Sequence, residues 1–227
     1  MTIQPQAHAV PRCAERKSLQ DAGAFLPSAR VRTRVVVPIR LADGRTAKPQ
    51  IFTFNGLVDG REHLAVAFGQ PRGDHGTLVR IHSECLTGDA FGSQRCDCGQ
   101  QLTECLSIMH EEGGVLLYLR QEGRGIGLYN KLDAYRLQDS GMDTFAANRA
   151  LNFADDERTY RVAAQILFAL GIGDIELLSN NPDKARQLRA CGVVVRTQRL
   201  TGVHVTSDNI RYLKAKVSHG GHNINIG

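Results

Sequence analysis

The chain has 227 residues, of which 42% are apolar and 22% charged, and these values favour one globular domain in water. Its formal net charge is +5, and residues 1–34 alone contain six Lys or Arg against two acidic residues. Because no apolar run approaches the roughly 20 residues that span a bilayer, and no continuous apolar segment typical of a secretory signal opens the chain, these features exclude membrane, fibrous and disordered proteins.

Residues 1–30 show no hydrophobic periodicity, and we expect a basic, flexible extension there. One folded domain is expected at 31–217, followed by a short tail at 218–227. Most of the excess positive charge falls before residue 35, so the rest of the chain is nearly neutral. A neutral folded part argues against a nucleic-acid partner.

The first third of the domain is expected to be rich in β-structure. Apolar and polar residues alternate over 31–39, which predicts a half-buried strand. A turn is predicted at 42–45, and three further strands are predicted at 51–54, 63–68 and 78–82. These short strands favour a meander or a small barrel.

Helices and strands alternate along the remainder, which is typical of α/β layering. Apolar residues at helical spacing predict five helices, at 100–112, 126–138, 157–170, 182–189 and 207–215. Apolar runs predict three strands, at 115–119, 175–178 and 193–195. In the second helix we expect Leu128 and Leu132 to face inward, and we expect Asn181 to cap the fourth.

Three of the six cysteines, Cys85, Cys96 and Cys98, lie within fourteen residues. Zinc favours thiolate ligands, and three protein ligands leave a fourth position for water, as in catalytic sites. A closed structural site would need a fourth ligand, for which His82 is the nearest candidate. Buried core cysteines are the alternative interpretation. The polar and glycine-rich surroundings favour a metal site, in a reducing compartment such as the cytoplasm.

Two junctions between a strand and a helix are candidates for binding an anion. The glycine-rich segment 120–127 contains Arg120 and Arg124, whose guanidinium groups suit phosphate oxygens, at the start of a predicted helix. A tight turn with a solvated Arg is the alternative. Ser179 and Lys184 mark the second junction, which a helix cap alone would also explain. Together with the thiols, these junctions indicate a phosphorylated substrate.

Residues 155–158 and Tyr135 have structural explanations as well as functional ones. Carboxylates in the first turn of a helix are favoured by the helix dipole, which would account for Asp156 without a function. The functional alternative is a proton acceptor beside Arg158, which would contact a phosphate. Tyr135 would ordinarily lie in the core with its hydroxyl hydrogen-bonded.

Five motifs, in order over 75–216, resemble those of the GTP cyclohydrolase II family. They are Arg80-Ile-His-Ser-Glu-Cys-Leu-Thr-Gly-Asp, Gly-Ser-Gln-Arg-Cys-Asp-Cys-Gly, Arg-Gln-Glu-Gly-Arg-Gly-Ile-Gly-Leu, Asp143-Thr-Phe-Ala-Ala-Asn148 and Asp156-Glu-Arg158. The resemblance implies a homodimer with an α/β fold in which a β-rich N-terminal part packs on a mixed sheet flanked by helices. It also implies the first step of riboflavin synthesis. In that step GTP is hydrolysed to 2,5-diamino-6-ribosylamino-4(3H)-pyrimidinone 5′-phosphate, with release of formate and pyrophosphate.

The resemblance implies a role for each residue that matches a family motif. Asp156 matches the proton acceptor, Arg158 the proposed nucleophile on the α-phosphate, and Tyr135 a tyrosine beside the base. The matching Zn²⁺ ligands are Cys85, Cys96 and Cys98, with water as the fourth ligand, and Mg²⁺ is expected with the triphosphate. The matching GTP contacts are Arg80, Ile81, His82, Ser83, Glu84, Gln101, Glu122, Gly123, Arg124, Thr144, Ser179 and Lys184.

Guanidinium is always protonated, so we expect Arg158 to hold a phosphate rather than to attack it. Two departures from the family pattern bear on the extent of the reaction: Asn152 replaces a usual Gly, and Met142 replaces a common Tyr. Some relatives open the ring and keep the formyl group, which is the alternative within the family. Outside it, the alternatives are a zinc-stabilised nucleic-acid-binding module and a redox-sensing thiol protein.

Overall fold

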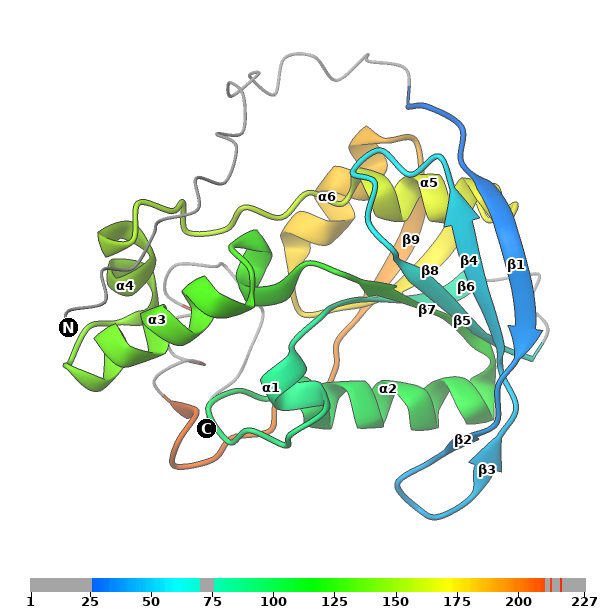
Figure 1. Ribbon diagram of the computed structural model, residues 1–227. Helices are drawn as coiled ribbons and strands as arrows, with labels where there is room; N and C mark the ends of the chain where they lie inside the picture. The colour runs from blue at the N-terminus through cyan, green and yellow to red at the C-terminus, as the bar shows by residue number, and fades with distance from the viewer. Residues whose placement is uncertain (1–25, 70–75, 211–212, 214–216, 218–227) are drawn as a thin grey trace, which may run out of the picture.

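A computed structural model describes residues 26–69, 76–210, 213 and 217 (Figure 1). Most of the extension expected at 1–30, the tail at 218–227 and part of the helix predicted at 207–215 lie outside the described residues. Residues 26–29 lie against the folded body. Leu26 packs on the main hydrophobic core, and Gln165 Nε2 donates a hydrogen bond to the Pro27 carbonyl at 2.6 Å.

One mixed sheet of seven strands, in the order β1-β4-β5-β7-β6-β8-β9, organises the fold (Figure 1). Pairing is antiparallel from β1 to β7 and parallel from β7 to β9. The N-terminal strands therefore form a meander that continues the α/β sheet. The strands are β1 (Arg30–Val36), β2 (Ile39–Arg40), β3 (Thr46–Ala47), β4 (Gln50–Asn55), β5 (Leu64–Phe68), β6 (Thr77–Ser83), β7 (Gly114–Leu119), β8 (Asp174–Leu178) and β9 (Val194–Arg199).

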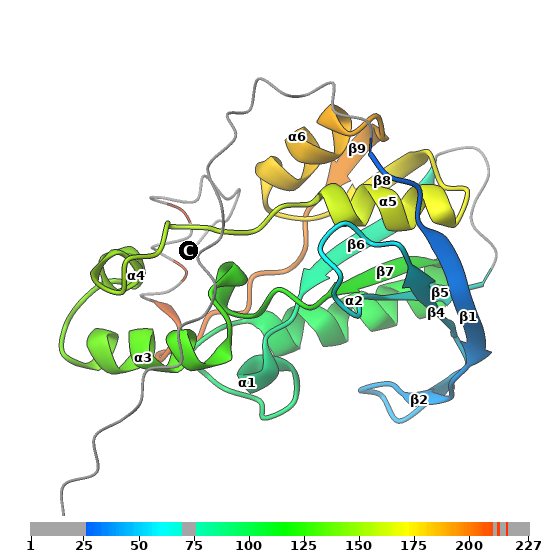
Figure 2. The ribbon, with the colours of Figure 1, turned by 45° about the horizontal axis from the view of Figure 1, so that its top comes forward.

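Helices cover both faces of the sheet (Figures 1 and 2). On one face α2 contributes Cys105 and Met109 to a core, and on the other α5 and α6 complete a larger core. The helix α3 extends away from the sheet, beside α4. The helices are α1 (Leu86–Asp89), α2 (Cys98–Glu112), the 3₁₀ turn η1 (Glu122–Gly125), α3 (Leu128–Asp139), α4 (Thr144–Ala150), α5 (Arg161–Ala169) and α6 (Pro182–Ala190).

The central strand β6 is buried on both faces because it lies between parallel neighbours under helices. Its residues alternate between the two cores: Val79 and Ile81 face α5, and Leu78 faces α2. Arg80 and His82 fall on the α2 face by the same alternation. Both polar side chains are therefore inside the protein.

Three expectations about burial and boundaries are wrong. The segment 31–39 is not half-buried, because β1 lies at the edge of the sheet and all its residues are exposed. The helix predicted at 157–170 begins only at Arg161, so residues 155–158 are not its first turn and the helix dipole does not explain Asp156. Leu132 is 45% exposed, because the face of α3 that packs on the body is the one that carries Lys131 and Ala134.

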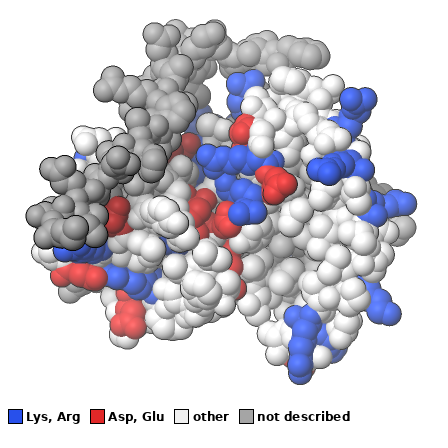
Figure 3. Space-filling view, in the orientation of Figure 1, with Lys and Arg blue, Asp and Glu red and all other residues white. Residues whose placement is uncertain are grey.

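The distribution of charge also differs from the expected one. Arg30, Arg32 and Arg34 belong to β1, and all three are exposed. Lys and Arg side chains line the right-hand edge of the face in Figure 3, the side on which β1 lies in Figure 1. The described residues nevertheless carry a net charge of only +1, from 21 Lys or Arg against 20 Asp or Glu, so the described body is nearly neutral, as expected.

Candidate active site

The carboxyl ends of three adjacent parallel strands carry the candidate residues. Cys85 follows β6, Glu122 follows β7 and Ser179 follows β8. Carboxyl ends of parallel strands meet at one edge of a sheet, which is where α/β proteins place their ligands. The sheet topology thus brings together segments that are up to 94 positions apart in the sequence.

The three cysteines of the predicted metal site converge at this edge. Their sulfur atoms all lie within 4.8 Å of one another, and the Cys85 and Cys96 Sγ atoms are 3.7 Å apart. A tetrahedral zinc site with bonds of about 2.3 Å separates its sulfur ligands by roughly 3.8 Å, so the spacing fits zinc. Among the described residues no other His, Cys, Asp or Glu joins this group, and His82 is not a member.

Two glycines make room for the thiols. A Cβ at Gly88 would lie 3.0 Å from Cys96 Sγ and 3.1 Å from Cys85 Sγ. A Cβ at Gly99 would lie 2.3 Å from the Gly88 carbonyl oxygen. Only glycine allows α1 and the start of α2 to approach this closely, and the approach creates the cradle around the sulfur atoms.

The protonation of the thiols shows that the cluster suits a cation. Hydrogen bonds from Cys96 and Cys98, together with the Lys131 ammonium, lower the pKa of the Cys85 thiol although burial opposes the shift. The contact with Cys85 raises the pKa of Cys96 to about 11. The contacts with Cys85 and Cys96, and then burial, raise the pKa of Cys98. The three thiolates repel one another, so a bound divalent cation is what allows all of them to ionise.

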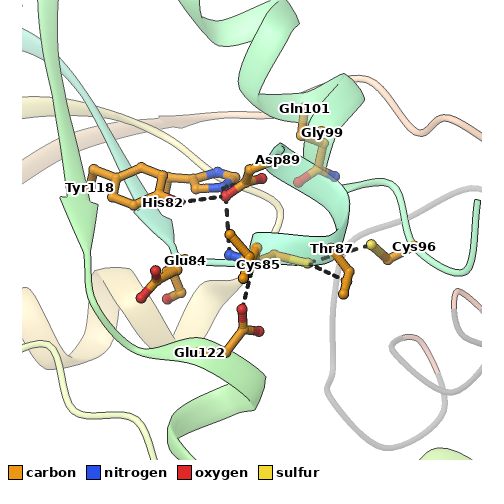
Figure 4. A network of polar contacts seen from close by, with 12 residues as sticks. His82, Glu84, Cys85, Thr87, Asp89, Cys96, Gly99, Gln101, Tyr118 and Glu122 are labelled. Atoms are coloured by element: carbon orange, nitrogen blue, oxygen red, sulfur yellow. Dashed lines mark hydrogen bonds and ion pairs between the residues drawn. The ribbon is translucent and has the colours of Figure 1, made fainter. Parts of the chain in front are cut away.

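Asp89 supports Cys85 from behind (Figure 4). Its carboxylate accepts hydrogen bonds from the Cys85 backbone N–H at 3.0 Å and the Tyr118 hydroxyl at 2.8 Å. His82 Nε2 lies 3.1 Å from the same carboxylate, and its ring stacks on Tyr118. Burial lowers the pKa of His82. His82, expected to contact GTP, is therefore buried behind the metal site and contacts Asp89.

Arg80 and Gln101 form a second buried support. The Arg80 guanidinium donates to Gln101 Oε1 at 2.8 Å and to the Leu178 carbonyl at 3.1 Å. Gln101 Nε2 in turn donates to Asp97 Oδ2 at 2.7 Å, between the ligands Cys96 and Cys98. Both expected GTP contacts thus hold the loop that carries the thiols.

Glu122 connects the thiol loop to the glycine-rich turn. Its carboxylate accepts hydrogen bonds from the backbone N–H of Leu86 at 2.6 Å and of Gly123 at 2.8 Å. In the same turn Gly123 and Arg124 adopt left-handed conformations, with φ of 61° and 59°. Such a conformation is uncommon for Arg, and it turns the backbone sharply beside the cysteines.

A cavity joins the thiols to half of the predicted substrate contacts. The three cysteines occupy one side, and residues of α3 and α4 occupy the other. Its lining residues are Ser83, Glu84, Cys85, Cys96, Cys98, Gln121, Glu122, Gly123, Arg124, Ile126, Lys131, Ala134, Tyr135, Gln138, Thr144, Asn148 and Arg158. The expected contacts outside this lining are Arg80, Ile81, His82, Gln101, Ser179 and Lys184.

Arg158 lines the cavity and forms an ion pair with Asp156, which is not among the lining residues. Arg158 Nε and its backbone N–H donate to Asp156 Oδ1 at 2.8 and 3.0 Å. Partial desolvation acts to raise the pKa of Asp156, but the Arg158 guanidinium outweighs it and the pKa is lowered. A second Arg158 nitrogen lies 3.4 Å from Ser83 Oγ. The carboxylate is 41% exposed and ionised, so it can accept a proton, and the guanidinium remains a cation.

Three residues lie on the side of the sheet edge next to Arg158. Lys184 Nζ donates to the Ile81 carbonyl at 2.7 Å, so Ile81 contributes backbone oxygen while its side chain is in the core. Ser179 is buried at the start of the α6 junction, where the Asn181 side chain caps the helix as predicted. The cations of Lys184 and Arg158 lie 5.6 and 6.0 Å from the Tyr160 ring centroid. Two cations and a hydroxyl here suit phosphate.

Tyr135 lies on the cavity wall and not in the hydrophobic core. The Arg95 guanidinium lies 4.5 Å from the Tyr135 ring centroid, and Arg95 forms an ion pair with Asp139 one turn further along α3. Burial raises the pKa of Tyr135, so the hydroxyl stays protonated and can donate a hydrogen bond. Sequence reasoning did not single out Arg95, although it lies within the second family motif.

Lys131, Asp89, Gly88 and Asn148 were also missed. Asp89, Gly88 and Asn148 are in quoted motifs, where their residue types alone did not indicate a role. Lys131 lies outside every motif, and no sequence signal points to it. Among the described helices none combines the length and apolarity needed to cross a membrane.

The fold and the site define an α/β protein in which a three-thiol cluster, compatible with a metal ion, lines a cavity at the carboxyl ends of the parallel strands. Consistent with this class, the family model described as GTP cyclohydrolase II matches residues 34–200. The GTP cyclohydrolase-2 of Vibrio parahaemolyticus is 55% identical over 178 residues, which cover 78% of this chain and 90% of the relative. That of Psychromonas ingrahamii is 48% identical over 194 residues, or 85% and 97% of the two chains.

A longer relative matches the same region. The riboflavin biosynthesis protein RibBA of Bacillus subtilis is 49% identical over 175 residues, which cover 76% of this chain and 44% of the relative. The chain belongs to the GTP cyclohydrolase II family, whose members are enzymes of riboflavin biosynthesis. The resemblance drawn from the five motifs is confirmed, and so is the α/β fold with its mixed sheet.

Proposed function

We propose that the chain hydrolyses GTP, opens the imidazole ring of guanine and releases formate and pyrophosphate. The product is 2,5-diamino-6-ribosylamino-4(3H)-pyrimidinone 5′-phosphate. The observation that carries this proposal is the shared cavity, in which the three thiols face Tyr135, Arg124 and Arg158. Membership in the family supplies the reaction, and the cavity brings a metal site and phosphate-binding cations within reach of one ligand.

Cys85, Cys96 and Cys98 would hold Zn²⁺, and their spacing and the cradle at Gly88 support this assignment. When bound, Zn²⁺ supplies an activated water for attack on the guanine ring. Mg²⁺ would accompany the triphosphate, because its oxygens are ligands that this ion prefers. The protein itself keeps the fourth side of the thiol cluster open toward the cavity, where the base would lie.

Asp156 and Arg158 would divide proton transfer and charge stabilisation between them. The lowered pKa keeps Asp156 in the ionised form that can accept a proton, and the contact with Arg158 makes this carboxylate a weaker base than a free Asp. Arg158 donates hydrogen bonds to Asp156, and its permanent positive charge suits the α-phosphate. We therefore assign Arg158 to phosphate binding and transition-state charge, not to nucleophilic attack.

The expected GTP contacts fall into three groups. Ser83, Glu84, Gly123, Arg124 and Thr144 line the cavity, and we propose direct contacts for them. Ser179 and Lys184, together with the Ile81 carbonyl, would serve the phosphate side of the site. The remaining four act through other residues: Arg80, His82 and Gln101 lie outside the cavity lining, and Glu122 lines the cavity but accepts hydrogen bonds from the protein backbone.

The structure favours the full reaction over ring opening alone. Asn152 has a left-handed backbone with φ of 62°, a conformation that Asn adopts more readily than most residues. It therefore keeps the loop geometry that Gly gives at this position in the family pattern. Met142 is exposed and is not among the residues that line the cavity, whereas Tyr135 is.

We also propose a cytoplasmic homodimer without nucleic-acid or membrane partners, with the catalytic domain at 31–217 between the extension and the tail. The family match over 34–200 lies inside these bounds. Because Leu26 and Pro27 contact the core, we place the functional start of the domain near residue 26. The absence of a nucleic-acid partner rests on the family and on the nearly neutral charge of the described body.

The test is incubation of the purified protein with GTP and Mg²⁺, with product mass, formate and pyrophosphate followed together. Formate and pyrophosphate in equal amounts with the diaminopyrimidinone are expected. A product that gains water and keeps the formyl carbon would support the ring-opening alternative. Unchanged GTP with zinc-loaded protein would contradict the proposed substrate.

A further inference from the structure

Lys131 is a buried cation that lies directly against the metal ligands. Its ammonium donates hydrogen bonds to Cys85 Sγ at 3.1 Å, to Thr87 Oγ1 at 3.0 Å and to Glu122 Oε1 at 2.9 Å. The side chain is 10% exposed. These three acceptors match the three ammonium protons, so Lys131 is placed to hold protein groups and not a substrate oxygen.

Burying an ammonium costs several kcal/mol unless hydrogen bonds and an opposite charge compensate. Glu122 supplies the opposite charge, but Glu122 also accepts two backbone hydrogen bonds. A neutral donor at position 131 would satisfy the Glu122 oxygen without this cost. A cation at position 131 also offsets the charge of the Cys85 sulfur, because a thiolate carries a full negative charge.

Charge in the occupied site leads to the same conclusion. Three thiolates around a divalent cation carry one net negative charge, and this charge is buried at the end of the sheet. The Lys131 ammonium offsets it from 3.1 Å. Groups that hydrogen-bond metal ligands in this way fix their orientation and tune the metal.

We propose that Lys131 is a positioning residue of the metal site, which holds the Cys85 sulfur and neutralises the three-thiolate centre. This inference rests on the proposed three-cysteine metal site. Lys131 also connects the site to its surroundings, because it lies on α3 one turn before Tyr135 and bonds the Glu122 carboxylate of η1. The segment that carries Cys85, the turn η1 and the helix α3 are thus connected through the Lys131 ammonium group.

Metal binding and the spectrum of the cobalt-substituted protein test the proposal. Lys131→Met should retain zinc about 10- to 100-fold less tightly than the wild type in competition with a chromophoric chelator. With Co²⁺ in the site, the sulfur-to-cobalt charge-transfer band should move to longer wavelength, because a thiolate without its hydrogen bond is a stronger electron donor. Lys131→Arg, which keeps a charged donor, should restore most of the affinity. Lys48→Met, at an exposed position, is the control and should match the wild type.

The outcomes separate this inference from the proposed function. A Lys131→Met protein with wild-type zinc affinity and an unshifted cobalt band would overturn the role of Lys131 and leave the metal site intact. A wild-type protein that binds neither zinc nor cobalt would overturn the metal site itself. If Lys131→Met does not fold, Lys131→Gln, a neutral donor, takes its place. The zinc affinity of Lys131→Gln should be lower than that of Lys131→Arg but still measurable by chelator competition. A zinc affinity equal to that of the wild type would refute the need for a charge at this position.

Discussion

The two sides of the cavity are built in different ways. On the metal side, each polar group is held by several buried partners: Asp89 supports Cys85, and Arg80 and Gln101 support the loop between Cys96 and Cys98. On the substrate side, the Asp156 carboxylate is 41% exposed, whereas the Asp89 carboxylate on the metal side is 8% exposed. The metal side is therefore a buried, preorganised network, and the substrate side presents a more exposed carboxylate to a ligand.

This difference predicts where substitutions act. Changes on the metal side should alter metal content, stability and activity together, because ligands and supports form one buried network. Changes on the substrate side should alter activity and leave metal and stability nearly unchanged. The following variants test the contrast, from the largest expected effect to the smallest.

Cys96→Ser should lose zinc and reduce turnover by about a thousandfold or more, because it removes one of three ligands to the metal that activates water. Zinc content by elemental analysis and formate release are the measurements. Cys191→Ser, a half-buried cysteine outside the cluster, is the matched control and should keep both. Unchanged zinc stoichiometry in the Cys96 variant would remove Cys96 from the ligand set.

Asp156→Ala should reduce kcat by roughly 10² to 10⁴, the range of general acid–base catalysis, while it keeps one zinc per chain and the wild-type Tm. The neighbouring Asp155→Ala is the control, since Asp155 only forms an exposed ion pair with Arg149. Loss of zinc in the Asp156 variant would break the distinction between the two sides. Wild-type rates would exclude Asp156 from the mechanism.

Gly99→Ala should destabilise the protein by about 1–3 kcal/mol and lower its zinc content, because the added carbon would meet the Gly88 carbonyl at 2.3 Å. Thermal unfolding with and without a chelator measures both effects. Gly173→Ala adds the same carbon where no atom lies within 4 Å and should be nearly neutral. Equal behaviour of the two variants would show that close packing at the cradle does not matter.

Deletion of residues 1–25 should leave both turnover and Tm unchanged. A longer deletion, of residues 1–29, should destabilise the protein by about 1–3 kcal/mol, because it removes Leu26 from the core and the acceptor at Pro27. Comparison of the two truncations by thermal unfolding locates the start of the domain. Loss of activity in a folded 26–227 protein would give the extension a function.

The predictable parts of the fold are those whose sequence pattern has one physical cause. The segments that form β6 and β7 are buried over nearly their whole length because helices cover both faces, and their prediction is confirmed. The helix α4 was missed because it has only seven residues and no long apolar stripe. The late start of α5 was missed because Asp156 and Arg158 resemble a first turn in sequence but pair with each other instead.

The site shows a similar division. The cysteines could be found because their spacing in sequence matches their function. Glu122 and Lys131 could not be placed, because their partners Leu86 and Cys85 are 36 and 46 positions away in the sequence. A polar residue of a family motif can face the substrate, or it can hydrogen-bond the protein groups that hold the thiols. Tertiary packing decides between the two, as His82 and Arg80 show.

The central claim is that three thiolates and one open position form the metal side of the cavity. X-ray absorption at the zinc edge of the wild-type protein, purified without added metal, tests it most directly. We expect one zinc per chain with three sulfur ligands at about 2.3 Å and one oxygen ligand. Four sulfur ligands, a histidine nitrogen among the ligands, or a protein without zinc would contradict the claim.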